Sequence, residues 1–165
     1  MLIPEFENIH HLKEFLVENL EYHEDKGFSI CGIFPGMEFH EVPKVLGEPE
    51  VYNTENDQQQ TMQYNSYIHH PAHGKREHYK LNMLFWAFHR EPFKIIKLHF
   101  DYHKTGNDAE DFNVFLKDFF KLVIEKFGMP EKKTFRFNRE ELVYMNGKKS
   151  MRIWNNAEGV RIELK

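Results

Sequence analysis

The sequence has almost no cysteine: Cys31 is the only one among 165 residues. A single cysteine cannot form an internal disulfide, and a cysteine-rich structural metal site is excluded as well. The residue lies in an apolar run between Ile30 and Gly32, which favours a buried thiol over a reactive nucleophile. A chain of this composition is typical of a reducing compartment, so we expect a cytoplasmic protein.

Long hydrophobic runs are missing too. No apolar stretch approaches the roughly 20 residues that a bilayer span needs, so we expect no membrane partner. Glu5 and Glu7 lie where a signal peptide would have a basic region, and no signal peptide is predicted. No G-x-S-x-G, P-loop, Rossmann glycine pattern or H-E-x-x-H occurs, so we expect neither a cofactor nor catalysis.

Apolar and aromatic residues are abundant by contrast. Hydrophobic residues make up 41% of the chain and aromatic residues 15%, with 16 phenylalanines. This supply supports a packed core, and the length allows one domain or two small fused units. We predict a single α+β domain over residues 1–165.

Helical periodicity occurs in three places. Apolar residues recur at helical spacing over residues 8–23 and, as a broad phenylalanine-rich stripe, over residues 107–127. A short helix is expected to end at Leu46, before the terminator Gly47. Pro43 requires that this helix start late or bend, because proline is tolerated only in the first turn.

The remaining apolar segments read as strands. They cover residues 28–33, 62–68, 79–88, 93–103, 134–138, 142–145, 150–154 and 160–164. The polar segments 53–61 and 69–78 are predicted to be loops, and Asn146-Gly147 is a hairpin signal. The expected fold is α+β, with a mostly antiparallel sheet of about six to eight strands and helices packed on one face.

One short segment recurs in similar form further along the chain. Residues 45–50 (Val-Leu-Gly-Glu-Pro-Glu) resemble residues 126–131 (Lys-Phe-Gly-Met-Pro-Glu), 81 positions later. Each copy ends a helix and leads into strands, which is consistent with two tandem α-β units, 1–88 and 89–165. The alternative is that helix–Gly–x–Pro is common punctuation.

Charge is distributed unevenly. Residues 1–60 hold 3 lysines against 13 acidic residues, a net charge of −10, whereas residues 131–165 hold 9 basic and 5 acidic residues, a net charge of +4. The acidic N-terminal helix could complement a basic partner. Its charges could equally be an ordinary solvated surface.

Two groups of histidines are candidate sites. His69, His70, His73 and His78 fall in a polar loop and are weak candidates for zinc or nickel, but their spacing matches no recognised metal site. On one face of the 93–103 strand lie His99, Asp101 and His103, which could form a binding surface, hold a metal or be a solvated sheet face.

The C-terminal strands carry outward-facing residues of the types that dominate protein-binding hot spots. These are Arg136, Arg152, Trp154 and Arg161. Together with His99, Asp101 and His103 they would form one mixed aromatic and charged sheet surface. Nucleic acid is a disfavoured partner because the net charge is −4. The alternative is an edge hairpin with solubilising arginines.

The segment Gly36-Met37-x-x-x-Glu41-Val42-x-x-x-Leu46-Gly47-x-Pro49 resembles the signature of small α+β modules of the SmpA/BamE type. Tandem copies of a similar unit build the β-lactamase inhibitory proteins. The sequence departs from the pattern where Glu38 replaces a capping Thr or Ser. The resemblance implies a protein-binding scaffold without chemistry of its own. The chain also resembles bacterial toxin-immunity proteins in size and acidity.

The expected function is therefore non-enzymatic. We predict an inhibitor or immunity-type module that binds another protein, such as a toxin or an enzyme, through an open sheet face or the acidic N-terminal helix. The alternatives are a small histidine- or metal-dependent enzyme and a structural assembly module.

Overall fold

The computed structural model describes residues 3–56, 59–70, 74–88, 95–101, 107–136, 139–156 and 159–165. In chain order the elements are α1 (Ile9–Asn19), β1 (Leu20–His23), β2 (Gly27–Ile30), a 3-10 turn η1 (Phe39–Glu41), α2 (Val42–Leu46), β3 (Val51–Asn56), β4 (Gln59–His70), β5 (Gly74–Phe88), β6 (Ile95–Asp101), α3 (Asn107–Phe127), β7 (Lys132–Arg136), β8 (Arg139–Asn146), β9 (Lys149–Asn155) and β10 (Gly159–Leu164).

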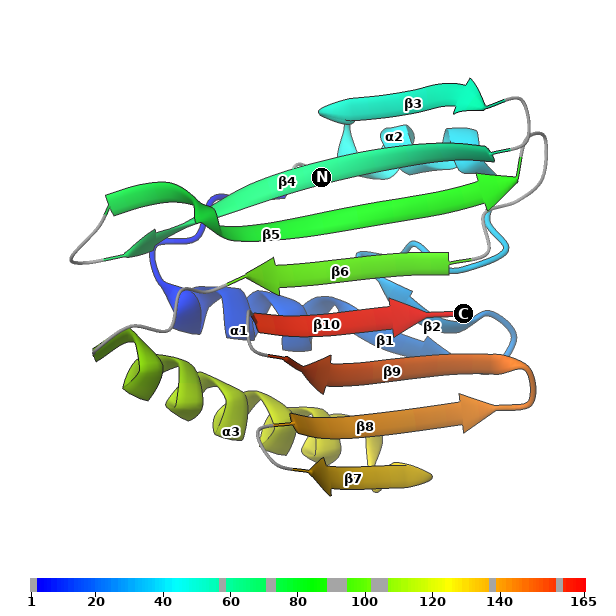
Figure 1. The fold of residues 1–165 in the computed structure, drawn as a ribbon. Coiled ribbons are helices and arrows are strands. Elements are labelled where there is room, and N and C mark those ends of the chain that lie inside the picture. The colour runs from blue at the N-terminus through cyan, green and yellow to red at the C-terminus, as the bar shows by residue number, and fades with distance from the viewer. Residues whose placement is uncertain are drawn as a thin grey trace.

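An antiparallel sheet of eight strands, in the order β3-β4-β5-β6-β10-β9-β8-β7, forms one layer of the molecule. The helices and the two-stranded β1–β2 hairpin lie on one side of this sheet (Figure 1). The predicted α+β class, the strand number and the one-sided packing of the helices are thus confirmed. None of the helices in the described ranges is long and apolar enough to cross a membrane.

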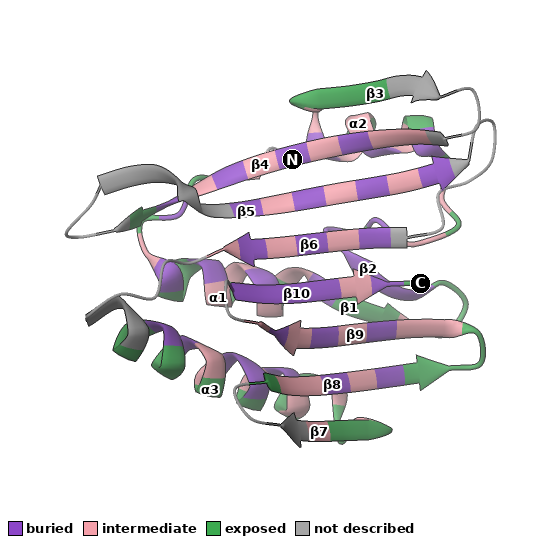
Figure 2. Cartoon of the chain, viewed as in Figure 1, coloured by how far each residue is buried: buried purple, intermediate pink, exposed green. Residues whose placement is uncertain are grey.

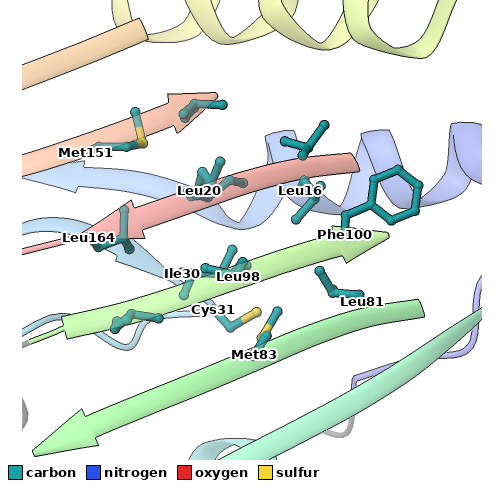
Figure 3. Close-up of a cluster of buried hydrophobic side chains, with 14 of the residues drawn as sticks. Leu16, Leu20, Ile30, Cys31, Leu81, Met83, Leu98, Phe100, Met151 and Leu164 are labelled. Atoms are coloured by element: carbon teal, nitrogen blue, oxygen red, sulfur yellow. The ribbon is translucent and has the colours of Figure 1, made fainter. Parts of the chain in front are cut away.

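The core lies between the helices and the sheet. Where burial is described along β4, β5, β6 and β9, buried residues alternate with half-buried ones (Figure 2). Because side chains alternate across a strand, every second one points at the helices. Leu16 and Leu20, on the helical side, and Leu98 and Met83 of the sheet belong to one buried cluster in this layer (Figure 3). Burying a side chain of this size contributes about 1.5–3 kcal/mol, so this layer supplies most of the driving force for folding.

The first helix is shorter than its apolar spacing predicts. Asn8 caps it, because the side-chain oxygen accepts hydrogen bonds from the His10 and His11 amides. The predicted end at His23 is wrong, since α1 ends at Asn19 and the next four residues form β1. Leu20 is fully buried and continues the apolar spacing of the helix, but it belongs to the strand that pairs with β2.

Both polar segments that were predicted as loops consist largely of strand. Residues 51–56 form β3, and β4 begins at Gln59 and runs as far as His70. β5 begins at Gly74, so the histidine-rich segment lies mostly in strands as well. The prediction failed because these stretches are rich in Asn, Gln and His, residue types with weak strand preference, which obscures the alternation of apolar and polar residues typical of a strand.

The two halves of the sheet are built alike. β3 to β6 form one four-stranded meander, β7 to β10 form another, and the meanders meet at the antiparallel β6–β10 pair. Counted inward from either edge of the sheet, four strands follow one another in chain order. The tandem-unit hypothesis remains a prediction, but this symmetry divides the chain after Asp101 rather than after residue 88.

An equivalent tyrosine hydrogen bond fixes the start of each meander. The Tyr64 hydroxyl donates to the carbonyl oxygen of Gly47 at 2.8 Å, and the Tyr144 hydroxyl donates to that of Gly128 at 2.9 Å. Both glycines have positive φ, 84° and 81°, which favours glycine at the end of a helix. The recurring segment thus marks two structurally equivalent helix ends.

We expect the free energy of unfolding to fall as pH rises from about 10 to about 12. Burial, reinforced by the Glu48 and Glu131 carboxylates, raises the pKa of Tyr64 and of Tyr144 to about 12 from an ordinary value of about 10. Below pH 10 both tyrosines are protonated in the folded and unfolded states, so their contribution to stability is complete. Above it the unfolded chain ionises first, and this contribution is lost by about pH 12.

Urea titrations between pH 7 and pH 12 test this expectation. Replacing both tyrosines with phenylalanine should cost about 1 kcal/mol per lost hydrogen bond at pH 7 and should make the alkaline decline shallower. Tyr52→Phe is the matched control, because Tyr52 is 55% exposed. An equally steep alkaline decline in the double variant would contradict the expectation.

Candidate functional site: the open sheet face

The sheet side opposite the helices, called here the open face, is the candidate site. No element of the described ranges lies over it (Figure 1). Strand pairing brings its side chains into cross-strand rows. One row runs Gln63, Leu84, Lys97, Glu163, Arg152, Val143, Lys132, and the next runs Asn65, Asn82, His99, Arg161, Trp154, Glu141, Thr134.

Trp154 and Arg152 lie side by side on this face, both on β9. The Arg152 guanidinium carbon lies 4.4 Å from the centroid of the Trp154 ring, in cation–π geometry. Its Nε also donates to the Glu141 carboxylate on β8. Burial opposes ionisation of Glu141, but Arg152 outweighs it and holds the pKa of this carboxyl below its ordinary value. The tryptophan therefore packs against an arginine whose position is fixed.

Arg161 joins β10 to β6 at the middle of the open face. Its Nη2 lies 2.7 Å from Asp101 Oδ1, and its Nη1 donates to the carbonyl oxygens of Phe100 and Val160. The whole residue is only 8% exposed. Arg161 is thus bound into the sheet, whereas a partner would meet the more exposed Arg152 and Trp154.

His99 lies between the same charges. Burial, followed by the positive charge of Arg161, lowers its pKa below the ordinary value, although Asp101 acts in the opposite direction. The imidazole is therefore neutral at pH 7 and can both donate and accept a hydrogen bond.

The other charges and amides of the open face also pair among themselves. Lys97 Nζ lies 3.9 Å from a Glu163 carboxylate oxygen. On the other half, Asn65 Oδ1 accepts from the Asn82 side-chain amide at 2.7 Å and from that of Gln63 at 3.2 Å. Glu163 also accepts Lys165 Nζ at 2.8 Å, so this carboxylate is shared between two lysines. The central charges are thus largely paired, which gives the face a fixed polar pattern of little net charge.

The structure brings together five of the seven predicted binding residues. His99, Asp101, Arg152, Trp154 and Arg161 share the open face across the neighbouring strands β6, β10 and β9. That they bind a partner remains a prediction.

The other two are not placed as side chains. His103 lies outside the described residues, and Arg136 is the last residue of β7, with a side chain that is likewise outside them.

The histidine-rich segment is divided between two strands. His69 and His70 end β4, and His78 lies in β5, whereas His73 lies outside the described residues. Among the side chains that the structure does describe, no three His, Cys, Asp or Glu residues gather as they would around a metal ion. Cys31 is buried with φ of 54°, and burial raises the pKa of its thiol to about 12, which makes it unreactive.

Sequence reasoning missed Trp86, which lies on the same face as Trp154. Leu84 and Trp86 alternate with the buried Met83, Phe85 and Ala87 along β5. That alternation was a usable signal, but the continuous apolar run from Met83 to Phe88 hid it. Both tryptophans of the chain are therefore on the open face.

A second surface feature is a groove of about 640 Å³ where β1, the end of α3 and β8 meet. Tyr22, Met129 and Met145 line it and are 39%, 75% and 53% exposed. The acidic N-terminal helix, α1, lies nearby, since Lys126 of α3 donates to the carbonyl oxygens of Val17 and Glu18 on α1. Within the described residues, these are the alternatives to the open face as a contact surface.

These features define an α+β protein in which no element of the described residues covers one face of the antiparallel sheet. No family model, curated protein or solved structure matches the chain. The resemblance to SmpA/BamE-type modules therefore remains a prediction.

Proposed function

We propose that this chain is a protein-binding module, of inhibitor or toxin-immunity type, that binds its partner through the open face. The observation that supports this most directly is the Trp154–Arg152 stack on a sheet surface that no described helix covers. Tryptophan and arginine are the residues most enriched in binding hot spots, and here both are held in place before a partner arrives.

The polar pattern of the face favours a protein over nucleic acid. A phosphate-binding surface needs cations that are available to the ligand. The guanidinium of Arg152 contacts Glu141 and that of Arg161 contacts Asp101, so each is already neutralised within the fold. A protein surface requires no such excess of positive charge.

Loss of partner capture is the first test. The tagged Arg152→Ala/Trp154→Ala double variant, expressed in cells of the source organism, should capture less than about a tenth of the partner that the unaltered chain captures. Truncating a hot-spot residue lowers the binding free energy by about 2 kcal/mol or more. Quantitative mass spectrometry of the captured proteins provides the measurement.

The control is a change of the same kind on the helical side. Val114→Ala/Lys121→Ala removes an exposed apolar residue and an exposed cation from α3, and it should leave capture unchanged. Circular dichroism should show that both variants keep the fold. The proposal would be wrong if the open-face variant, folded, captured as much partner as the control.

A further inference from the structure

The open face has a local two-fold symmetry that the strand registers define. The Lys97–Glu163 pair lies at its centre, where β6 meets β10. On one side of this pair, Leu84 on β5 is the cross-strand partner of Lys97, and Gln63 on β4 is that of Leu84. On the other side, Arg152 on β9 is the partner of Glu163, and Val143 on β8 is that of Arg152. The flanking pairs agree, since Leu98 faces Ile162 and Ile96 faces Leu164. Every pair of an antiparallel ladder admits such an axis locally. The equivalence of Tyr64 and Tyr144, which directly follow Gln63 and Val143, places the two-fold axis of the sheet at the Lys97–Glu163 pair.

This symmetry makes Trp86 and Trp154 equivalent. Trp86 lies two residues after Leu84, and Trp154 lies two residues after Arg152. The sequences around them are also similar, Met83-x-Phe-Trp86 and Met151-x-Ile-Trp154. Met83 is the cross-strand partner of Tyr64, and Met151 is that of Tyr144. Both indoles are half-buried on the same face, on opposite sides of the axis.

The separation of the two tryptophans follows from sheet geometry. They stand three strands apart and are displaced by two residues in opposite directions along their strands. Strand spacing of about 4.8 Å and a rise of about 3.4 Å per residue place them roughly 20 Å apart. That span exceeds a single contact and fits within a standard interface of about 800 Å² per partner.

We infer that the open face is bipartite, with Trp86 and Trp154 as two equivalent anchors for one partner. The partner is a single folded protein that presents two apolar protrusions about 20 Å apart on a contact surface of little net charge. The inference rests on the proposed function and adds the second anchor and the chemistry of the occupant. Lys97, Arg152 and Arg161 at the centre of the face each lie near a carboxylate of the chain itself. The centre therefore offers a partner aromatic rings rather than unpaired charge, which complements a contact surface of little net charge.

A second copy of the chain fits this face less well. Two sheets that pack face to face need apolar inner faces. The centre of this face holds Lys97, Glu163, His99 and Arg161, whose burial against an identical polar surface would be costly.

Site-specific photo-crosslinking tests the inference in the intact chain. The photoreactive amino acid p-benzoylphenylalanine replaces Trp86 in one variant, Trp154 in a second and the exposed Val114 on α3 in a third. The variants are irradiated in cells of the source organism, and the adducts are identified by mass spectrometry. The expected result is one and the same protein joined to positions 86 and 154, with no adduct of that protein at position 114.

The possible outcomes separate the two proposals. Crosslinks from position 154 alone would overturn the second anchor and leave the proposed function intact. No adduct from either tryptophan position would overturn both. An adduct with another copy of the chain, or with nucleic acid, would replace the inferred occupant.

Tryptophan fluorescence gives a second measurement with the crosslinked protein as the probe. The variants Trp86→Phe and Trp154→Phe each keep one tryptophan, so a titration reports on one anchor at a time. We expect both emissions to shift at the same partner concentration, and Trp86→Ala and Trp154→Ala each to weaken binding at least about 30-fold. Raising the salt concentration from about 0.05 to 0.5 M should change the affinity by less than about threefold, because the face is internally neutralised. An unchanged affinity of Trp86→Ala or a steep dependence on salt would contradict the inference.

Discussion

Phe115→Ala is expected to lower the free energy of unfolding by about 3–5 kcal/mol. Phe115 is fully buried in α3. Its ring centroid lies 5.2 Å from that of Phe100 on β6 and 5.6 Å from that of Phe119 one turn along the helix. The loss combines the apolar area returned to water with the cavity left between helix and sheet.

Urea unfolding at pH 7 measures this loss. Val114→Ala, one position away on the same helix, is the matched control, because Val114 is 47% exposed and should change stability by less than about 0.5 kcal/mol. A loss below about 1.5 kcal/mol for Phe115→Ala would show that α3 is held to the sheet mainly by other contacts. The open face should be unaffected in the fraction that remains folded, because the ring lies on the opposite side of the sheet.

The second half of the chain could be predicted closely, since its signals are strong and local. The phenylalanine stripe and Gly128 gave α3 its bounds, and they agree with the structure. Asn146-Gly147 predicted the hairpin between β8 and β9, where Gly147 has φ of 59°. Short alternating segments between turns also gave the four C-terminal strands within a few residues.

The first half was predicted less well because tertiary contacts override its local pattern. The helical spacing from Ile9 to Leu20 is real, yet the last residues of the predicted helix leave α1 to pair with β2. β3 and the ends of β4 are rich in Asn, Gln and His, residues with weak strand preference. These strands are stabilised by pairing within a wide sheet, which a local pattern cannot reveal.

The candidate site could be predicted in part. Alternation along β6, β9 and β10 was enough to place Arg152, Trp154 and His99 on one face. Strand order was needed to show that these strands are neighbours and that Trp86 belongs with them. The symmetry about the Lys97–Glu163 pair follows from cross-strand register, which a single sequence does not specify.

The integrity of the open face depends on the central β6–β10 pair, which joins the two meanders. Gly159, the first residue of β10, faces Asp101 across this pair. A Cβ atom at Gly159 would lie 1.8 Å from the carbonyl oxygen of Phe100 and 3.0 Å from the Cα of Asp101. These neighbours are backbone atoms and cannot rotate away, so any larger side chain must push the strands apart.

Gly159→Ala is therefore expected to destabilise the fold by about 1–3 kcal/mol, and Gly159→Val by more. Elsewhere in a strand, replacing glycine with alanine usually stabilises by reducing the entropy of the unfolded chain. The sign of the change thus distinguishes the backbone clash from an ordinary glycine effect. Ser150→Ala on β9 is the control, since Ser150 is half-buried and should alter stability by less than about 0.5 kcal/mol.

Urea unfolding and amide hydrogen exchange give the readout for Gly159→Ala. Exchange should accelerate in β6 and β10 first, because opening of this pair breaks the bonds that unite the two halves of the sheet. Arg161 should lose its contact with the Phe100 carbonyl oxygen as the strands separate, and partner capture should then fall although both tryptophans are unchanged. If Gly159→Ala were as stable as the unaltered chain, the expected clash between the alanine Cβ and the Phe100 carbonyl oxygen, at 1.8 Å, would be contradicted.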